Sequence, residues 1–113
     1  ITNDVATNYH FEGWVLDTIG RQLISPQKVI VSLSGGEYRL LQTLLDHANR
    51  VLTRDQLMDW IVGRESTPFD RSIDVQISRL RQRLDDSGKQ PKLIKTVRGE
   101  GYILSASVEK VAL

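Results

Sequence analysis

The most regular hydrophobic pattern in the chain lies in residues 70–84, DRSIDVQISRLRQRL. Its apolar positions are spaced by four, three and four residues, at Ile73, Ile77, Leu80 and Leu84. At about 100° per residue these side chains form one narrow stripe, which is typical of a helix face packed against a core. The pattern therefore predicts an amphipathic helix over residues 70–84, ending at the DDSG sequence that follows it. The two acids there lie near the negative end of the helix dipole, so we assign them no stabilising role.

Two further helices are predicted upstream, and each begins with a capping box, in which a hydroxyl and a side-chain carbonyl satisfy free backbone amides reciprocally. The first opens at Ser34 in SGGE and ends at Asn49, a residue suited to a left-handed stop. Its apolar stripe consists of Tyr38, Leu41, Leu44, Leu45 and Ala48. The second opens at Thr53 in TRDQ and ends at Gly63, with Leu57, Met58 and Ile61 as its buried face. A strand-like pair, residues 51–52, separates the two helices.

Short apolar runs broken by turn residues predict β-structure on both sides of the helices. Between residues 9 and 33 the runs are interrupted at Gly13, Gly20 and Pro26, which predicts an antiparallel sheet of three or four strands. After Pro91, the sequence LIKTVRGEGYIL predicts a β-hairpin with RGEG, residues 98–101, at its tip. We expect residues 1–8 to be a linker remnant, 9–105 the domain, and 106–113 a C-terminal tail.

Composition narrows the class of protein to one globular domain of modest size. The chain has 113 residues, of which 40% are hydrophobic and 26% charged, and no run approaches the ~18 apolar residues of a membrane helix. Cysteine is absent, which excludes a disulfide framework and a thiolate metal site and fits a cytoplasmic protein. The Gly-x-Gly pair in the hairpin precedes a strand rather than a helix, so dinucleotide binding is rejected. We expect no cofactor.

Charge is distributed unevenly along a chain whose formal net charge is only +1. Residues 1–70 carry six Lys/Arg against nine Asp/Glu, whereas residues 71–104 carry eight against four. One region is therefore acidic and the other basic, so a nearly neutral protein can still present a basic face to nucleic acid.

The face of the 70–84 helix opposite the apolar stripe has the chemistry of a DNA-reading surface. It carries Arg71, Val75, Ser78 and Arg79, with Ser72 and Gln76 towards one side and Asp74 and Arg81 on the flanks. Arginine can bind guanine edges or phosphates, glutamine and serine can hydrogen-bond base edges, and a valine methyl can contact a thymine methyl. A solvated charged face is the alternative, and it is the commoner explanation of a charge run.

The order of predicted elements is sheet, helix, helix, loop, basic helix, basic hairpin. Three helices with a hairpin beside the third make a winged helix-turn-helix, in which the third helix reads the major groove and the hairpin reaches the backbone or minor groove. The fold class is therefore α+β.

Four motifs in order, LSGGEYRLL, VLTRDQLMD, SIDVQISRLRQRL and LIKTVRGEGYIL, closely resemble the DNA-binding effector domain of OmpR/PhoB-type bacterial response regulators. The resemblance covers residues 11–104. It implies a four-stranded N-terminal sheet, three helices and a C-terminal wing, and sequence-specific double-stranded DNA binding that regulates transcription. It also implies a parent protein with a phosphorylatable receiver domain and a sensor kinase, in a bacterial cytoplasm.

By motif position, the resemblance also implies a set of DNA contacts. Its recognition-helix contacts fall on Arg71, Ser72, Asp74, Val75, Gln76, Ser78, Arg79 and Arg81, and its wing contacts on Thr96, Arg98 and Tyr102. It implies that loop 64–69 can contact RNA polymerase, although the sequence alone describes that loop as a plain connector. The family binds tandem direct repeats as head-to-tail dimers, so we expect a monomer alone and a dimer on DNA.

The sequence leaves the roles of Asp74 and Tyr102 open. Asp74 is unusual on a DNA-facing helix; it can orient Arg71 or accept a hydrogen bond from a cytosine amino group. Tyr102 suits the core and a phosphate contact equally.

Two other classes of function, catalysis and protein binding, are disfavoured by the sequence. Catalysis is disfavoured because the only histidines, His10 and His47, have no nucleophile or metal partners in the pattern. A winged helix that binds protein would need a less basic third helix and wing.

Overall fold

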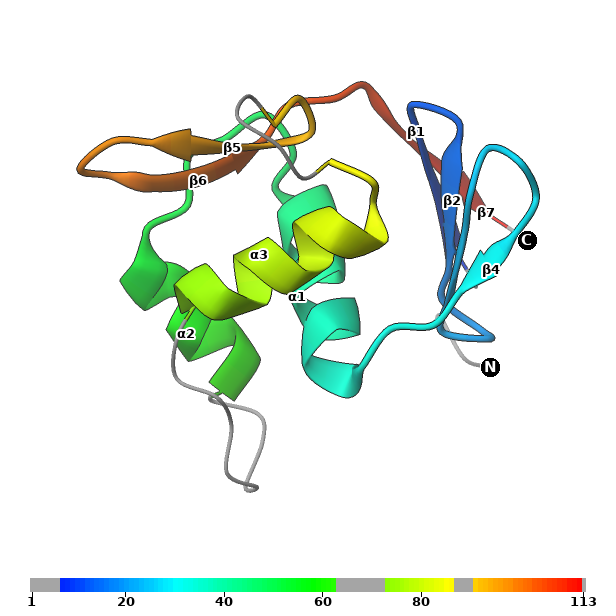
Figure 1. The fold of residues 1–113 in the computed structure, drawn as a ribbon, viewed down its shortest axis with the longest axis horizontal. Helices are drawn as coiled ribbons and strands as arrows, with labels where there is room; N and C mark the ends of the chain where they lie inside the picture. The colour runs from blue at the N-terminus through cyan, green and yellow to red at the C-terminus, as the bar shows by residue number, and fades with distance from the viewer. Residues whose placement is uncertain (1–6, 63–72, 87–90, 113) are drawn as a thin grey trace.

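The structure is a computed structural model, and it describes residues 7–62, 73–86 and 91–112. A β-sheet stands at one end of the molecule, a β-hairpin projects at the other, and the helices lie between them (Figure 1). The helices are α1 (Gly35–Asp46), α2 (Arg54–Val62) and α3 (Ile73–Arg83). The sheet contains β1 (Thr7–Phe11), β2 (Trp14–Asp17), β3 (Gln22–Ile24), β4 (Ile30–Val31) and β7 (Val108–Ala112), and the hairpin is β5 (Ile94–Val97) with β6 (Gly101–Leu104). The predicted α+β class and the three helices are confirmed.

Both predicted capping boxes are present. At the start of α1, the Glu37 amide donates to Ser34 Oγ at 3.1 Å, and Glu37 Oε1 accepts from the Ser34 amide at 3.1 Å. At the start of α2, Thr53 and Gln56 make the same reciprocal pair at 2.9 and 3.1 Å. Asn49 takes the expected left-handed conformation after α1, with φ of 64°. The two helix starts were therefore fixed by local hydrogen bonding that the sequence makes visible.

The large sheet has five strands in the order β4-β3-β2-β1-β7, one more than the family resemblance implied. Residues 108–112, expected to be part of a tail, form β7 and pair antiparallel with the whole of β1, from Thr7↔Ala112 to Phe11↔Val108. β1 also begins inside the expected linker remnant 1–8. The added strand covers the edge of β1, which would otherwise expose unpaired backbone groups.

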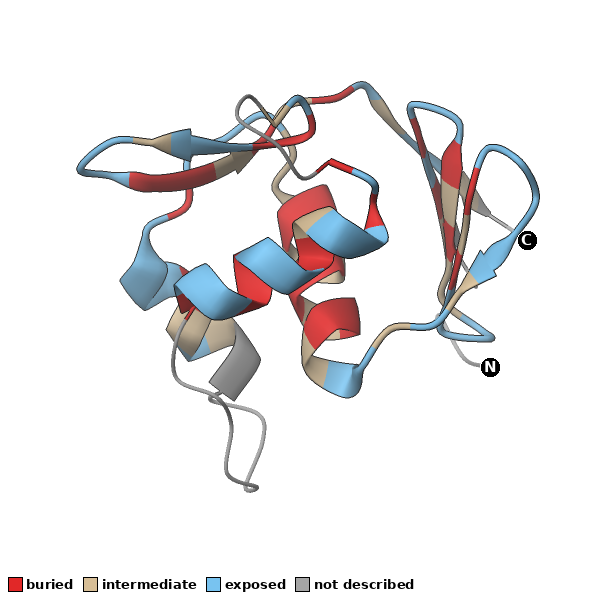
Figure 2. Cartoon of the chain, viewed as in Figure 1, coloured by how far each residue is buried: buried red, intermediate tan, exposed pale blue. Residues whose placement is uncertain are grey.

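The predicted apolar stripe of α3 is buried as a unit. Ile73, Ile77, Leu80 and Leu84 are each at most 3% exposed and join one core with α1 and the sheet. Leu40, Leu41 and Leu44 of α1 are fully buried in the same core. Exposed and buried positions alternate along α3 as expected of a helix with one packed face (Figure 2). Packing of this stripe therefore sets which side of α3 faces outward.

The hairpin is attached to the helices through the backbone of the short segment between α1 and α2. Leu52 and Tyr102 exchange two backbone hydrogen bonds, of 2.8 and 3.0 Å, as an isolated antiparallel bridge. Gly101 makes this approach possible, because a Cβ on it would lie 2.0 Å from the Leu52 carbonyl oxygen. The predicted strand-like pair 51–52 is thus the point at which the hairpin joins the helical unit.

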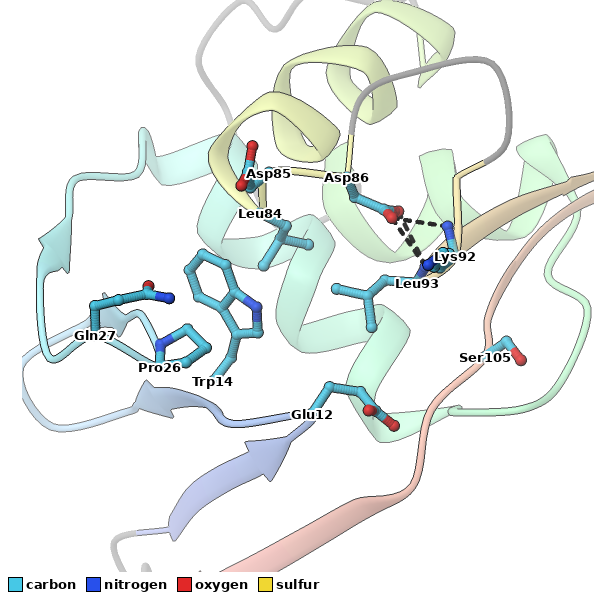
Figure 3. Close-up of a pocket in the computed structure, with 10 residues that line it drawn as sticks. All are labelled: Glu12, Trp14, Pro26, Gln27, Leu84, Asp85, Asp86, Lys92, Leu93 and Ser105. Atoms are coloured by element: carbon cyan, nitrogen blue, oxygen red, sulfur yellow. Dashed lines mark hydrogen bonds between the residues drawn. The ribbon is translucent and has the colours of Figure 1, made fainter.

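The assignment of no stabilising role to the acids after α3 was wrong for Asp86. Its buried carboxylate accepts backbone hydrogen bonds from Lys92 and Leu93 (Figure 3) and from Ile94, at 2.7 to 3.1 Å. These amides lead into β5, so Asp86 satisfies the donors of the segment that enters the hairpin. Helix-dipole reasoning missed this because the partners lie beyond the helix, across a turn.

The burial of α3 generates a stability prediction. Ile77→Ala should lower the free energy of unfolding by roughly 2–5 kcal/mol, because it leaves a cavity beside α1. Val75→Ala, on the outer face of the same helix, is the matched control and should change the free energy of unfolding by less than about 0.5 kcal/mol. Urea unfolding of the three proteins measures both values. Equal stabilities for Ile77→Ala and wild type would contradict the described packing.

Candidate nucleic-acid interface

Helix α3 presents four of the predicted DNA contacts to solvent. Val75 is 39% exposed, and Ser78 and Arg79 are exposed one turn further along. Asp74 is also exposed, in the first turn of the helix. A helix with one packed face and a row of polar and small apolar groups on the other fits the dimensions and chemistry of a major groove.

Gln76 does not lie on the outer face of α3, where the helical wheel placed it. It was placed towards the outer face, but it is only 5% exposed, and its Oε1 has no hydrogen-bond partner among the described residues. The physical reason is that α3 packs over a wider arc than its four aliphatic residues suggest, and the arc reaches Gln76. The expectation that its amide faces outward was therefore wrong.

The hairpin β5–β6 carries two of the three predicted wing contacts at exposed positions, whereas the third, Tyr102, is buried. Thr96 and Arg98 are exposed, and so is the neighbouring Lys95. The tip closes with a hydrogen bond from the Glu100 amide to the Val97 carbonyl at 3.0 Å. Gly99 at the tip has φ of 77°, a conformation that favours glycine. Arg98 thus lies at a tight turn, and Lys95 lies on the strand that leads into it.

Arg81 ties α3 to the hairpin. Its Nε and Nη2 donate to the Ile94 carbonyl oxygen at 2.9 and 2.7 Å, and Nη2 also donates to Thr96 Oγ1 at 3.0 Å. A planar guanidinium that holds one carbonyl with two donors gives a directional contact. Arg81 therefore fixes the position of β5 relative to α3.

Tyr102 and Asp74 contact each other, and Asp74 also contacts Arg54. The Tyr102 ring is buried, while its hydroxyl donates a hydrogen bond to Asp74 Oδ1. The same oxygen accepts from Arg54 Nε at 2.9 Å. Of the two suggested packings for Tyr102, the core is the one observed. Asp74 bonds to Arg54. Arg71, the partner suggested from the sequence, lies outside the described residues.

These contacts shift the pKa values of the groups involved. The hydrogen bond from Tyr102, and then that from Arg54, hold the pKa of Asp74 below its usual range. Burial, followed by the bond to Asp74, raises the pKa of Tyr102. The bond to Asp74 raises the pKa of Arg54. Asp74 is thus an ionised carboxylate at neutral pH.

Sequence reasoning missed Arg54, which belongs to this surface through its bond to Asp74. It lies 20 residues before its partner and follows a cap, and neither feature marks it as part of a site. Two predicted contacts, Arg71 and Ser72, and the predicted polymerase-contacting loop 64–69 lie outside the described residues.

Comparisons with known proteins agree with this geometry. The family described as "Transcriptional regulatory protein, C terminal" matches residues 27–104. The chain belongs to this family. It is the family of non-enzymatic DNA-binding domains of OmpR/PhoB-type response regulators, so the resemblance drawn from the four motifs is confirmed.

Among curated relatives, the transcriptional regulatory protein GltR of Pseudomonas aeruginosa is 47% identical over 98 residues, which cover 87% of this chain and 40% of GltR. The aerobic respiration control protein ArcA of Escherichia coli is 33% identical over 102 residues, covering 90% of this chain and 43% of ArcA. The chain thus spans about two fifths of the length of these relatives.

Among solved structures, the DNA-binding domain of Klebsiella pneumoniae RstA, in complex with the RstA box, matches with a TM-score of 0.76 and 36% identity. That match covers 87% of this chain and 96% of the RstA chain. The effector domain of BfmR from Acinetobacter baumannii matches with a TM-score of 0.74 and 38% identity, over 92% and 94% of the two chains. Within the described parts of this chain, no helix is long and apolar enough to cross a membrane.

The Asp74 contacts generate a pH prediction. Because the pKa of Asp74 is lower in the folded than in the unfolded state, its contribution to stability is present above the unfolded pKa, near 3.8, and is lost as pH falls through the folded pKa. The free energy of unfolding should therefore fall less steeply below about pH 4 in Asp74→Asn than in wild type. Urea unfolding between pH 2.5 and 6 tests this, and parallel pH curves for the two proteins would contradict it.

Proposed function

We propose that this chain recognises specific double-stranded DNA sequences, with α3 in the major groove and the β5–β6 wing on the backbone or in the adjacent minor groove. The observation that carries the proposal is the orientation of α3. Its apolar side is buried in the core, and this turns Val75, Ser78 and Arg79 outward beside the basic wing. The RstA domain, which shares this fold at 36% identity, was solved in complex with its DNA box.

The proposed contacts divide into base-reading and positioning groups. Val75 and Arg79 lie one turn apart on the outer face, where a helix in the groove meets base edges. Thr96 and Arg98 on the wing supply backbone or minor-groove contacts, which add affinity without reading much sequence. Arg81 and Tyr102 support this surface through their contacts within the protein. Contacts by Arg71, Ser72, Asp74 and Gln76 rest on the sequence pattern and the resemblance, and the burial of Gln76 argues against a contact from its side chain.

We also propose that the chain acts within a longer response regulator that controls transcription in the bacterial cytoplasm. The lengths of GltR and ArcA support this, since this chain spans about two fifths of each. A receiver domain phosphorylated by a sensor kinase would then control DNA binding. Contact between loop 64–69 and RNA polymerase would pass the signal to transcription.

Assembly on DNA follows the same proposal. The chain is proposed to be monomeric alone and to bind tandem direct repeats as a head-to-tail pair. Support comes from the family and from the absence of a heptad seam in the sequence that could hold a stable dimer. Sedimentation of the free chain, and of the chain with one or two half-sites, tests this directly. A stable dimer without DNA would refute it.

The division of roles between α3 and the wing generates a matched pair of variants. Arg79→Ala should lower affinity for the best site by about 1–3 kcal/mol and relax the preference at one base pair. Arg98→Ala removes the same charge from the wing and should weaken binding to most sequences while leaving the preferred sequence unchanged.

Selection of bound DNA from a random pool, followed by salt titration on the selected site, measures both effects. Binding through phosphates should weaken steeply as the salt concentration rises. If Arg79→Ala kept the wild-type base preference, α3 would not be the reading helix. If wild type bound no DNA, or bound DNA without salt dependence, the proposed function would be wrong. Protein binding by the winged helix would then be the alternative function.

A further inference from the structure

Three side chains from three different elements meet at the edge of the proposed DNA-binding surface. Arg54 is the first residue of α2, Asp74 lies in the first turn of α3, and Tyr102 is in β6 of the wing. Asp74 Oδ1 accepts hydrogen bonds from both Arg54 Nε and the Tyr102 hydroxyl. The Arg54 guanidinium also lies over the Tyr102 ring, 5.6 Å from its centre. We call these three residues the Asp74 cluster.

Stability does not explain why Arg54 belongs to the Asp74 cluster. The side chains of Arg54 and Asp74 are 53% and 57% exposed, and ion pairs that are open to water contribute little to the free energy of folding. A buried tyrosine ring needs a partner for its hydroxyl, but one carboxylate or water would satisfy that need without an arginine. The second bond from Arg54 therefore serves a different purpose.

The contacts restrict where the Arg54 side chain lies. An exposed arginine samples many rotamers, and a carboxylate at Nε together with an aromatic ring removes much of that freedom. The bond to Asp74 uses Nε, one of the five N–H donors of the guanidinium. An arginine held in this way binds a phosphate with a smaller loss of conformational entropy than a free one.

The negative charge of Asp74 gives a second reason for the presence of Arg54. A carboxylate on a helix that faces DNA is repelled by phosphates unless a cation neutralises it. Arg54 supplies that cation, and the Tyr102 hydroxyl occupies the same carboxylate oxygen. In a helix-turn-helix the helix before the recognition helix crosses the DNA backbone, and Arg54 is at the start of that helix here.

We propose that Arg54 contacts a DNA phosphate from outside the recognition helix and the wing, and that Asp74 and Tyr102 are positioning residues that hold it there. This inference rests on the proposed function, since it assigns one more contact to the same DNA interface. Asp74 then acts through Arg54 and does not accept a hydrogen bond from a base.

Arg54→Ala provides the first test, on the DNA site selected with wild-type protein. Affinity near 0.1 M salt should fall about tenfold, and the slope of log affinity against log salt concentration should become shallower by about one, with the base preference unchanged. Arg54→Lys keeps the charge and should recover part of the slope. Lys110→Ala is the matched control, because Lys110 is also an exposed cation paired with an acid, Asp46 at 3.6 Å, but on β7. Its slope should equal that of wild type.

The positioning role is tested with Tyr102→Phe, which removes the hydroxyl without changing the charge. If the hydroxyl helps to hold Arg54, then Arg54→Ala should weaken binding less in the Tyr102→Phe background than in wild type. A purely structural role for Tyr102 would lower the melting temperature and leave the two mutational effects additive. Additive effects would thus overturn the positioning role.

The outcomes separate this inference from the proposed function. If wild type shows salt-dependent, sequence-specific binding while Arg54→Ala keeps the wild-type affinity and slope, only the Arg54 contact is refuted. The same conclusion follows if Arg54→Ala and Lys110→Ala lower the slope equally. The change in slope would then come from the loss of one positive charge, wherever that charge lies on the protein. If wild type shows no such binding, the proposed function itself fails.

Discussion

Burial of one apolar stripe fixes the orientation of α3, and the rest of the interface depends on that constraint. Ile73, Ile77, Leu80 and Leu84 are all at most 3% exposed, so α3 cannot rotate without exposing aliphatic surface that the core now covers. The outward direction of Val75 and Arg79 follows from this packing and from helical geometry. Specificity in the proposed function is therefore a consequence of core packing on the opposite face.

The wing is held to this helix by a second group of contacts, most of them polar. Arg81 binds β5 through the Ile94 carbonyl, Asp86 satisfies the amides that enter β5, and the Leu52 bridge joins β6 to the segment between α1 and α2. Asp74 and Tyr102 add a contact from α3 to β6. Because these bonds join the hairpin to elements on two sides, α3 and the wing can approach DNA as one preformed surface.

Much of this was predictable, and the reason is that the signals were local. The stripe of α3, the capping boxes at Ser34 and Thr53, and the RGEG hairpin tip each depend on residues within a few positions of one another. The outward direction of Val75 and Arg79 followed from the same periodicity.

The features that sequence reasoning missed depend on partners far along the chain. β7 forms because β1 offers an edge about 100 residues earlier, and a short segment such as VEKVA carries little pattern of its own. Arg54 meets Asp74 across 20 residues, and Asp86 finds its donors beyond the end of α3. Gln76 was misplaced because a helical wheel gives the angle of a residue and not the width of the packed arc.

Because one side of α3 is packed against the core, its opposite side is the proposed DNA-reading surface. The most direct measurement is a titration of the isotopically labelled chain with its selected DNA site, followed through assigned backbone amide resonances. Our account predicts the largest shifts at residues 74–79 of α3 and at the wing tip around Arg98, with small shifts in β2 and β3. Largest shifts in the sheet, with α3 unaffected, would contradict it.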